Sequence, residues 1–134
     1  MRIGVFSRMC GMGDILSDDR AFMHKIGPEI CHDTIGSVRS LMNTVTDEEI
    51  ESQIALDYER FDVDPNLSHA SHASAVREYF GFKKFLEQNH YDAFTAHFDQ
   101  FAADGRFRQL PLYGASNLMA DGYGYAAEGD FVCA

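Results

Sequence analysis

The sequence predicts a single α/β domain built on a mostly parallel sheet. Its 134 residues are the usual length of one domain. Short runs rich in β-branched and aromatic residues alternate with stretches of helical periodicity. The first apolar run is followed by a loop, a helix and a second apolar run, the order of a βαβ unit with parallel strands. We therefore expect a three-layer, Rossmann-like or flavodoxin-like fold over residues 1–134, with helices on both faces of the sheet.

Four strands are expected, over residues 3–6, 29–33, 93–98 and 123–126. Each is a short run without the length of a helix. The third run leads directly into Asp99, which places a carboxylate at the carboxyl end of a strand. Open α/β sheets bind their ligands at that edge, so the location suits chemistry.

Five helices are expected, over residues 17–25, 37–44, 46–61, 68–88 and 112–121. Ser17 can cap the first helix, and Gly27 ends it. The third opens with the capping box from Thr46 to Glu49. Its apolar stripe is imperfect and consists of Ile50, Ile54, Leu56 and Tyr58.

The expected helix 68–88 has the clearest periodicity. Its polar side chains predict a solvated face formed by Arg77, Glu78, Lys84 and Glu87. His69 and His72 lie three residues apart at its start, a spacing that could bring two imidazoles to one metal. Serine and asparagine surround them, so a solvated first turn is the better interpretation.

Composition and charge exclude several classes of function. The formal net charge of −10 argues against electrostatic binding of a nucleic-acid backbone. No apolar run approaches the roughly 20 residues that a membrane-spanning helix needs, and no secretory signal is recognisable. Three widely spaced cysteines without a Cys-x-x-Cys motif favour a reducing, cytoplasmic compartment. We expect neither nucleic acid nor a membrane as a partner.

Two features could carry chemistry, and the residues alone leave both open. The loop Cys10-Gly11-Met12-Gly13-Asp14 follows the first strand and could be a flexible turn, a loop for a sugar or polar ligand, or a nucleotide loop. Asp99 and Glu128 each follow an expected strand, so they could hold a divalent cation at one sheet edge or could cap helices. His97 is expected to be packed and hydrogen-bonded, on the same face as Asp99.

Three segments resemble the L-arabinose isomerase family and its L-fucose isomerase relatives. They are residues 93–99, the stretch Arg108-Gln109-Leu110-Pro111, and residues 118–131, with Gly122-Tyr123-Gly124-Tyr125 followed by Glu128-Gly129-Asp130. The last segment is the most specific. The likeness covers the whole chain and matches the middle of a sugar isomerase, so we expect the central domain of such an enzyme, truncated after the Glu-Gly-Asp turn.

The resemblance implies specific site residues. Glu128 corresponds to a glutamate that binds a divalent metal, usually Mn²⁺. Asp99 falls at a second carboxylate position, where the arabinose pattern has glutamate, and the two would share ligand and acid/base roles. Met12 and Asp14 match the loop that lines the sugar pocket.

The family's two histidine ligands lie beyond the Glu-Gly-Asp turn, so this chain alone is expected to be inactive. The resemblance also implies a sugar substrate in the full-length enzyme and a homo-oligomer whose sites form between subunits. The alternative is a stand-alone α/β module that binds a small ligand or mediates oligomerisation without catalysis.

Overall fold

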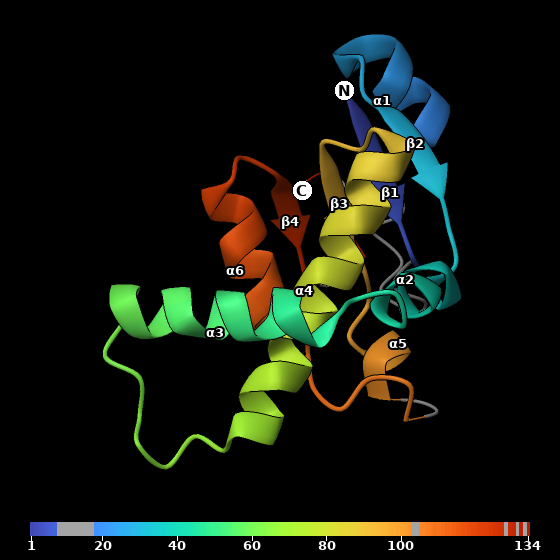
Figure 1. Ribbon diagram of the computed structural model, residues 1–134. Helices are drawn as coiled ribbons and strands as arrows, with labels where there is room; N and C mark the ends of the chain where they lie inside the picture. Colours follow the sequence, from blue (N-terminus) through green and yellow to red (C-terminus); the bar gives the residue numbers. More distant parts are fainter. Residues whose placement is uncertain (8–17, 103–104, 128, 131, 133) are drawn as a thin grey trace.

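The protein forms a four-stranded parallel sheet with six helices among its described residues (Figure 1). The computed structural model describes residues 1–7, 18–102, 105–127, 129–130, 132 and 134. The strands are β1 (Arg2–Val5), β2 (Glu29–His32), β3 (Ala93–Thr95) and β4 (Gly124–Ala126), in the order β2-β1-β3-β4. All three neighbouring pairs are parallel. The predicted α/β fold is confirmed.

The helices are α1 (Asp19–Ile26), α2 (Ile35–Met42), α3 (Asp47–Arg60), α4 (His69–Asn89), α5 (Asp99–Ala102) and α6 (Leu112–Ala120). The capping box predicted for α3 is present, because Thr46 N–H donates to Glu49 at 2.7 Å and Glu49 N–H donates to Thr46 Oγ1 at 3.2 Å. The prediction that Ser17 caps α1 is wrong: Asp18 is the N-cap and accepts from two backbone amides of the first turn. Gly27 ends α1, as predicted, and it lies in the left-handed region at φ +111°.

The expected strand 93–98 is three residues too long. β3 ends at Thr95, because its neighbours β1 and β4 offer ladder partners only as far as Val5 and Ala126. The chain then turns, with Gln100 N–H donating to the carbonyl of His97, and enters α5, which the sequence did not predict. The expected helix 37–44 lies at Ile35–Met42, with Thr34 as its N-cap.

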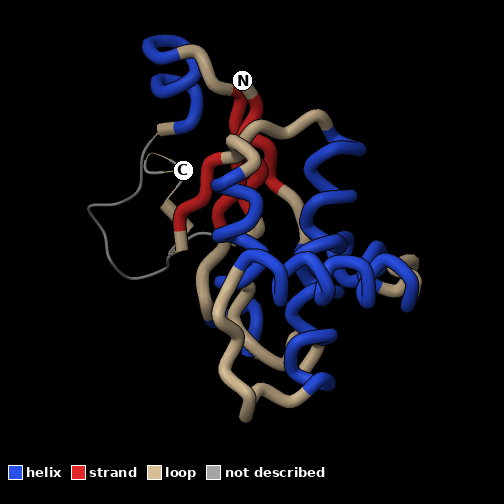
Figure 2. Tube along the Cα trace, turned by 60° about the vertical axis from the view of Figure 1, so that its left-hand side comes forward, coloured by secondary structure: helices blue, strands red, loops and turns tan. Residues whose placement is uncertain are grey.

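Apolar side chains cover the two faces of the sheet. On one face, Phe22 of α1 packs near Ile3, Val5 and Ala93. On the other face lies the main core, formed largely by α2, α4 and α6. Figure 2 shows α1 on one side of the strands and most of the helices on the other. None of the described helices is both long enough and apolar enough to span a membrane.

The long helix α4 lies at the centre of the helical layer and packs against α2, α3 and α6. Two glycines permit this close packing. A Cβ at Gly81 would lie 2.4 Å from Cγ of Met42 in α2, and a Cβ at Gly114 would lie 3.0 Å from Cα of Tyr79 in α4. The close approach of α6 to α4 places Tyr113, the residue before Gly114, near the start of α4.

Candidate functional site

The carboxyl end of the sheet carries the first candidate site. β3 and β4 are adjacent and in register, with Thr95 opposite Ala126. The buried Thr95 hydroxyl donates to the carbonyl of Ala126 at 2.8 Å, which ties the two strand ends together. Asp99 follows β3 by four residues and Glu128 follows β4 by two. Since β3 and β4 are parallel neighbours, both strands end at the same edge of the sheet.

Asp99 is the first residue of α5, and 71% of its side chain is exposed. Its backbone N–H donates to Nδ1 of His97 at 3.3 Å, and its Oδ2 lies 3.4 Å from the same nitrogen. The His97 ring is largely buried and stacks on Phe98, with ring centroids 4.2 Å apart. His97 is thus packed and hydrogen-bonded, as predicted, but a turn brings it to Asp99, not the alternation of a strand.

The donors at this edge match a hard divalent cation in chemical type, since an exposed carboxylate oxygen is a ligand that Mn²⁺ prefers. The described part of the chain contains no group of three His, Cys, Asp or Glu side chains placed to hold an ion. The other predicted site residues, Met12, Asp14 and Glu128, lie outside the described residues.

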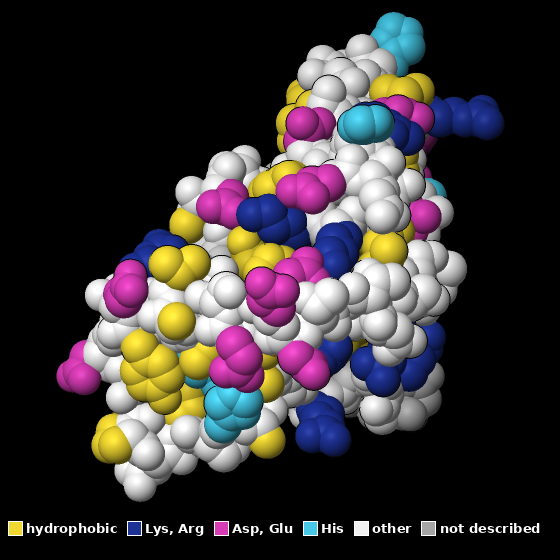
Figure 3. Space-filling view, viewed as in Figure 1, with side chains coloured by type: hydrophobic (Ala, Val, Ile, Leu, Met, Phe, Trp, Pro, Cys, Tyr) yellow, Lys and Arg dark blue, Asp and Glu magenta, His cyan; other side chains and the backbone are white. Residues whose placement is uncertain are grey.

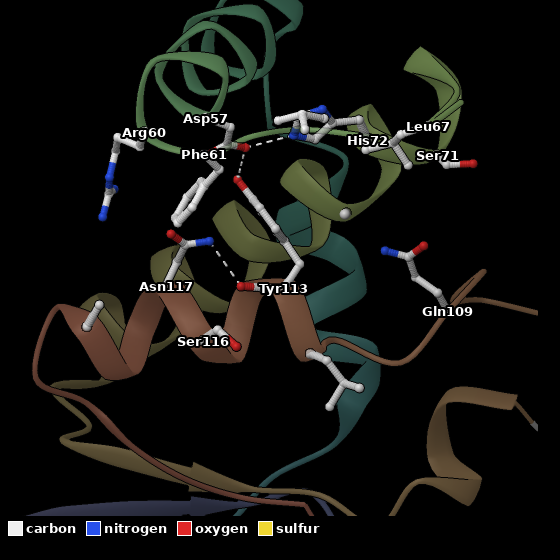
Figure 4. Close-up of a pocket in the computed structure, with 14 residues that line it drawn as sticks. Asp57, Arg60, Phe61, Leu67, Ser71, His72, Gln109, Tyr113, Ser116 and Asn117 are labelled. Atoms are coloured by element: carbon white, nitrogen blue, oxygen red, sulfur yellow. Dashed lines mark hydrogen bonds and ion pairs between the residues drawn. The ribbon is translucent and has the colours of Figure 1, made fainter. Parts of the chain in front are cut away.

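A second candidate site lies in the helical layer, where a cavity of about 550 Å³ opens between α3, α4 and α6. This volume is typical of small-molecule pockets. Figure 4 shows Asp57 of α3, His72 of α4 and Tyr113 of α6 converging at its wall. Phe61 and Leu67 also line it, and Figure 3 shows hydrophobic side chains gathered over the end of α3 and the loop to α4.

A buried hydrogen-bond network joins the three helices at this cavity. Oδ2 of Asp57 accepts from Nε2 of His72 at 2.7 Å and from the Tyr113 hydroxyl at 2.5 Å. Oδ1 of Asp57 accepts from Nε2 of Gln53 at 2.9 Å. Burial, and then the neighbouring Asp57 carboxylate, raise the pKa of the Tyr113 hydroxyl, so it stays protonated and donates. Both oxygens of Asp57 are satisfied, and the network acts as a polar cross-link between helices.

The network corrects the interpretation of the two histidines on α4. The prediction of a solvated first turn is confirmed for His69, whose side chain is 64% exposed and whose Nε2 lies 2.8 Å from Oε1 of Glu51. It is wrong for His72, which is 6% exposed because its side of α4 is covered by α3 and α6. The two imidazoles have different carboxylate partners and do not form one metal site.

The sequence carried one signal for Asp57 that was missed. Ile50, Ile54 and Asp57 are the buried residues of α3, and their spacing of four and three places them on one face. Leu56 and Tyr58, predicted to belong to the apolar stripe, are 48% and 58% exposed. A carboxylate at the third buried position indicates a polar partner on another helix.

Comparison with known proteins identifies the family. The L-arabinose isomerase central domain matches residues 15–134 of the chain. The chain belongs to the L-arabinose isomerase family. The matched range contains Asp99 and Glu128, and it begins after Met12 and Asp14.

Individual L-arabinose isomerases show the same relationship. The enzyme of Pediococcus pentosaceus is 38% identical over 99 residues, which are 67% of this chain and 19% of that enzyme. The enzyme of Clostridium beijerinckii is 35% identical over 97 residues, covering 72% of this chain and 19% of the relative. The enzyme of Lactiplantibacillus plantarum is 32% identical over 112 residues, which are 80% of this chain and 23% of that enzyme. The chain thus spans about a fifth of the length of these relatives.

Proposed function

We propose that this chain is the central domain of a metal-dependent aldose–ketose isomerase acting on L-arabinose or a related sugar, with Asp99 and Glu128 as its metal and acid/base carboxylates. The observation that carries the proposal is the family match over residues 15–134, which includes both positions. The order of the sheet supports it, because β3 and β4 are neighbours and lead to these two residues.

The proposed chemistry is the movement of a proton between C1 and C2 of an open-chain sugar. A divalent cation such as Mn²⁺, when bound, supplies polarisation of the carbonyl and hydroxyl oxygens. Asp99 is suited to hold a cation or to accept a proton because its carboxylate is exposed and its backbone is anchored on His97. Glu128 would take the complementary role, and Met12 and Asp14 would contact sugar hydroxyls.

The aspartate at position 99 affects the choice of substrate. Its side chain is one methylene shorter than glutamate and reaches roughly 1.5 Å less far. Because the relatives are named L-arabinose isomerases, we propose L-arabinose as the substrate of the complete enzyme. A related aldose is the alternative, which applies where the shorter side chain changes the shape of the pocket. Asp99→Glu, made in a protein that carries the complete site, should shift the kcat/KM ratio toward L-arabinose if position 99 contacts the reacting atoms.

The direct test measures Mn²⁺ binding to the 134-residue chain. Binding is monitored by electron paramagnetic resonance, because the signal of free Mn²⁺ decreases as the ion binds. Two carboxylates leave most of about six coordination positions to water, so we expect a dissociation constant on the order of millimolar. Asp99→Asn and Glu128→Gln should each weaken binding, whereas the control Glu48→Gln, on the exposed side of α3, should not. Mn²⁺ binding that survives both substitutions would place the cation elsewhere and contradict the assignment.

Two further expectations belong to this proposal. Since the chain matches about a fifth of its relatives, we expect no conversion of L-arabinose by the chain alone; brisk Mn²⁺-dependent turnover would contradict the proposed division of the site. We also propose that the protein acts in the cytoplasm and self-associates, with Cys31 as a free thiol. Analytical ultracentrifugation tests the self-association.

A further inference from the structure

A cavity of about 420 Å³ opens between α2, α4 and the segment 105–108. Neither Asp99 nor the Asp57 network contributes to its wall. Four arginines line it: Arg39, Arg77, Arg106 and Arg108. They are half of the eight arginines in a chain whose net charge is −10, and Figure 3 shows Lys and Arg side chains gathered near α2 and α5. We call this cavity the arginine cavity.

Three elements position the arginines around the cavity. On α4, Ala70, Ala73, Ser74 and Arg77 have the spacing of one helix face, and three small side chains there leave open space beside the guanidinium group. On α2, Gly36 and Arg39 are three residues apart and share a face. Arg106 lies across that face, since its Nη1 would be 3.4 Å from a Cβ built on Gly36.

Two carboxylates lie near the arginines of the cavity among the described residues. Arg77 donates to the carbonyl of Val45 at 2.9 Å and to Asp47 at 3.2 Å, but Asp47 is 94% exposed, so water weakens this ion pair. Glu78 is the carboxylate among the described residues that line the cavity. It is 1% exposed, and neither of its oxygens has a hydrogen-bond partner among the described residues. The described lining of the cavity thus contains one carboxylate, Glu78, and four arginines.

We propose that the arginine cavity binds the phosphate group of a small molecule, either as inorganic phosphate or on a phosphorylated sugar. Guanidinium groups bind phosphate oxygens through paired, charge-assisted hydrogen bonds. The volume suits a small ligand. A nucleic acid would require an extended basic surface, which is unfavourable at a net charge of −10. The proposal concerns a site separate from Asp99 and Glu128, so it stands whether or not these two carboxylates bind a metal.

The first experiment titrates the 134-residue chain with inorganic phosphate and with ribose 5-phosphate by isothermal calorimetry, at constant ionic strength set with chloride. Arg39→Gln and Arg108→Gln should each weaken binding roughly tenfold, the effect of one charge-assisted hydrogen-bond pair. The control Arg20→Gln removes an exposed arginine of α1 and should leave the affinity unchanged. Circular dichroism checks that each variant is folded.

Each outcome of this titration either supports or overturns the proposed phosphate site. Tighter binding of ribose 5-phosphate assigns the site to a phosphorylated small molecule, and equal affinities assign it to the free anion; both support the proposal. No saturable heat with either compound, or equal affinities in wild type and both cavity variants, overturns it. An oligonucleotide that binds more tightly and is lost in the same variants would overturn the small-molecule assignment.

The second experiment uses the buried carboxylate. The charged groups that line the described cavity wall together with Glu78 are Arg39 from α2, Arg77 from α4, and Arg106 and Arg108 from the segment 105–108. Ionised Glu78 opposes an anion, and burial raises the pKa of its carboxyl to about 7. Sulfate, whose charge is constant near neutral pH, should therefore bind several-fold more weakly at pH 8 than at pH 6. Glu78→Gln should remove most of this difference; an unchanged pH profile would place the bound anion outside the arginine cavity.

Discussion

Removing the hydroxyl of Tyr113 tests whether the buried network between α3, α4 and α6 stabilises the fold. The Tyr113 hydroxyl donates to Asp57 at 2.5 Å, and Asp57 is 2% exposed. In Tyr113→Phe the carboxylate keeps its bonds to His72 and Gln53 and loses one charge-assisted hydrogen bond. The ring contacts with His72 and Tyr79 remain. A lost hydrogen bond to a buried charge costs about 1.5 to 3 kcal/mol.

The expected loss converts into measurable quantities. For a chain of 134 residues, unfolding entropies of about 2.1 cal/mol/K per residue give a fall in Tm of roughly 5 to 11 °C. Urea unfolding followed by circular dichroism should show a lower midpoint with an unchanged slope. The matched control is Tyr58→Phe on α3, where the side chain is 58% exposed and the change should stay within about 0.5 kcal/mol. If Tyr113→Phe is no more destabilising than the control, the network does not stabilise the fold as we argue.

Three further predictions concern single residues. Burial raises the pKa of Glu78 to about 7 from 4.5, so the stability that this group contributes at low pH is lost as pH rises through 7. Glu78→Gln should remove this loss, so that between pH 5 and pH 8 the variant gains roughly 2 to 3 kcal/mol of unfolding free energy relative to wild type in urea unfolding; the same pH dependence in both proteins would refute the prediction. Thr46→Ala breaks the capping box and should cost about 1 kcal/mol in the same assay, against less than about 0.5 kcal/mol for Glu48→Gln, which removes only an exposed charge from the same helix turn. Phe82 is fully buried among four aromatic rings, so Phe82→Ala should cost about 3 to 5 kcal/mol; less than 2 would mean that the core collapses around it.

Local chemistry made much of the fold predictable. The capping box at Thr46 and the left-handed Gly27 depend on neighbouring residues alone, and both were found where the sequence indicated. The end of β3 depends on other strands. Residues 96–98 continue an apolar run, yet Phe98 is 45% exposed and Thr95 is the last residue with ladder partners. A hydrophobic pattern does not report where the neighbouring strands stop.

The candidate sites were predictable to different degrees. Asp99 was found because it follows a strand, and a family pattern pointed to it and to Glu128. The network of Asp57, His72 and Tyr113 was missed because its members lie 15 and 41 residues apart in sequence on three helices. Polar side chains at separate sequence positions give no sign that they will meet until the helices are packed.

Helix α4 shows why a single amphipathic pattern was insufficient. Arg77 and Glu78 were predicted to share its solvated face, yet Glu78 is 1% exposed. The pattern assumes one buried face and one wet face, whereas α2, α3 and α6 cover α4 on several sides. A polar residue in such a helix must meet either a partner or a cavity. His72 bonds to Asp57, and Glu78 lines the arginine cavity. These two departures from the expected pattern lie at the two cavities. The hydrogen bond to Asp57 compensates the burial of His72, whereas burial raises the pKa of Glu78 to about 7, so that its carboxyl keeps its proton at lower pH and carries no buried charge there.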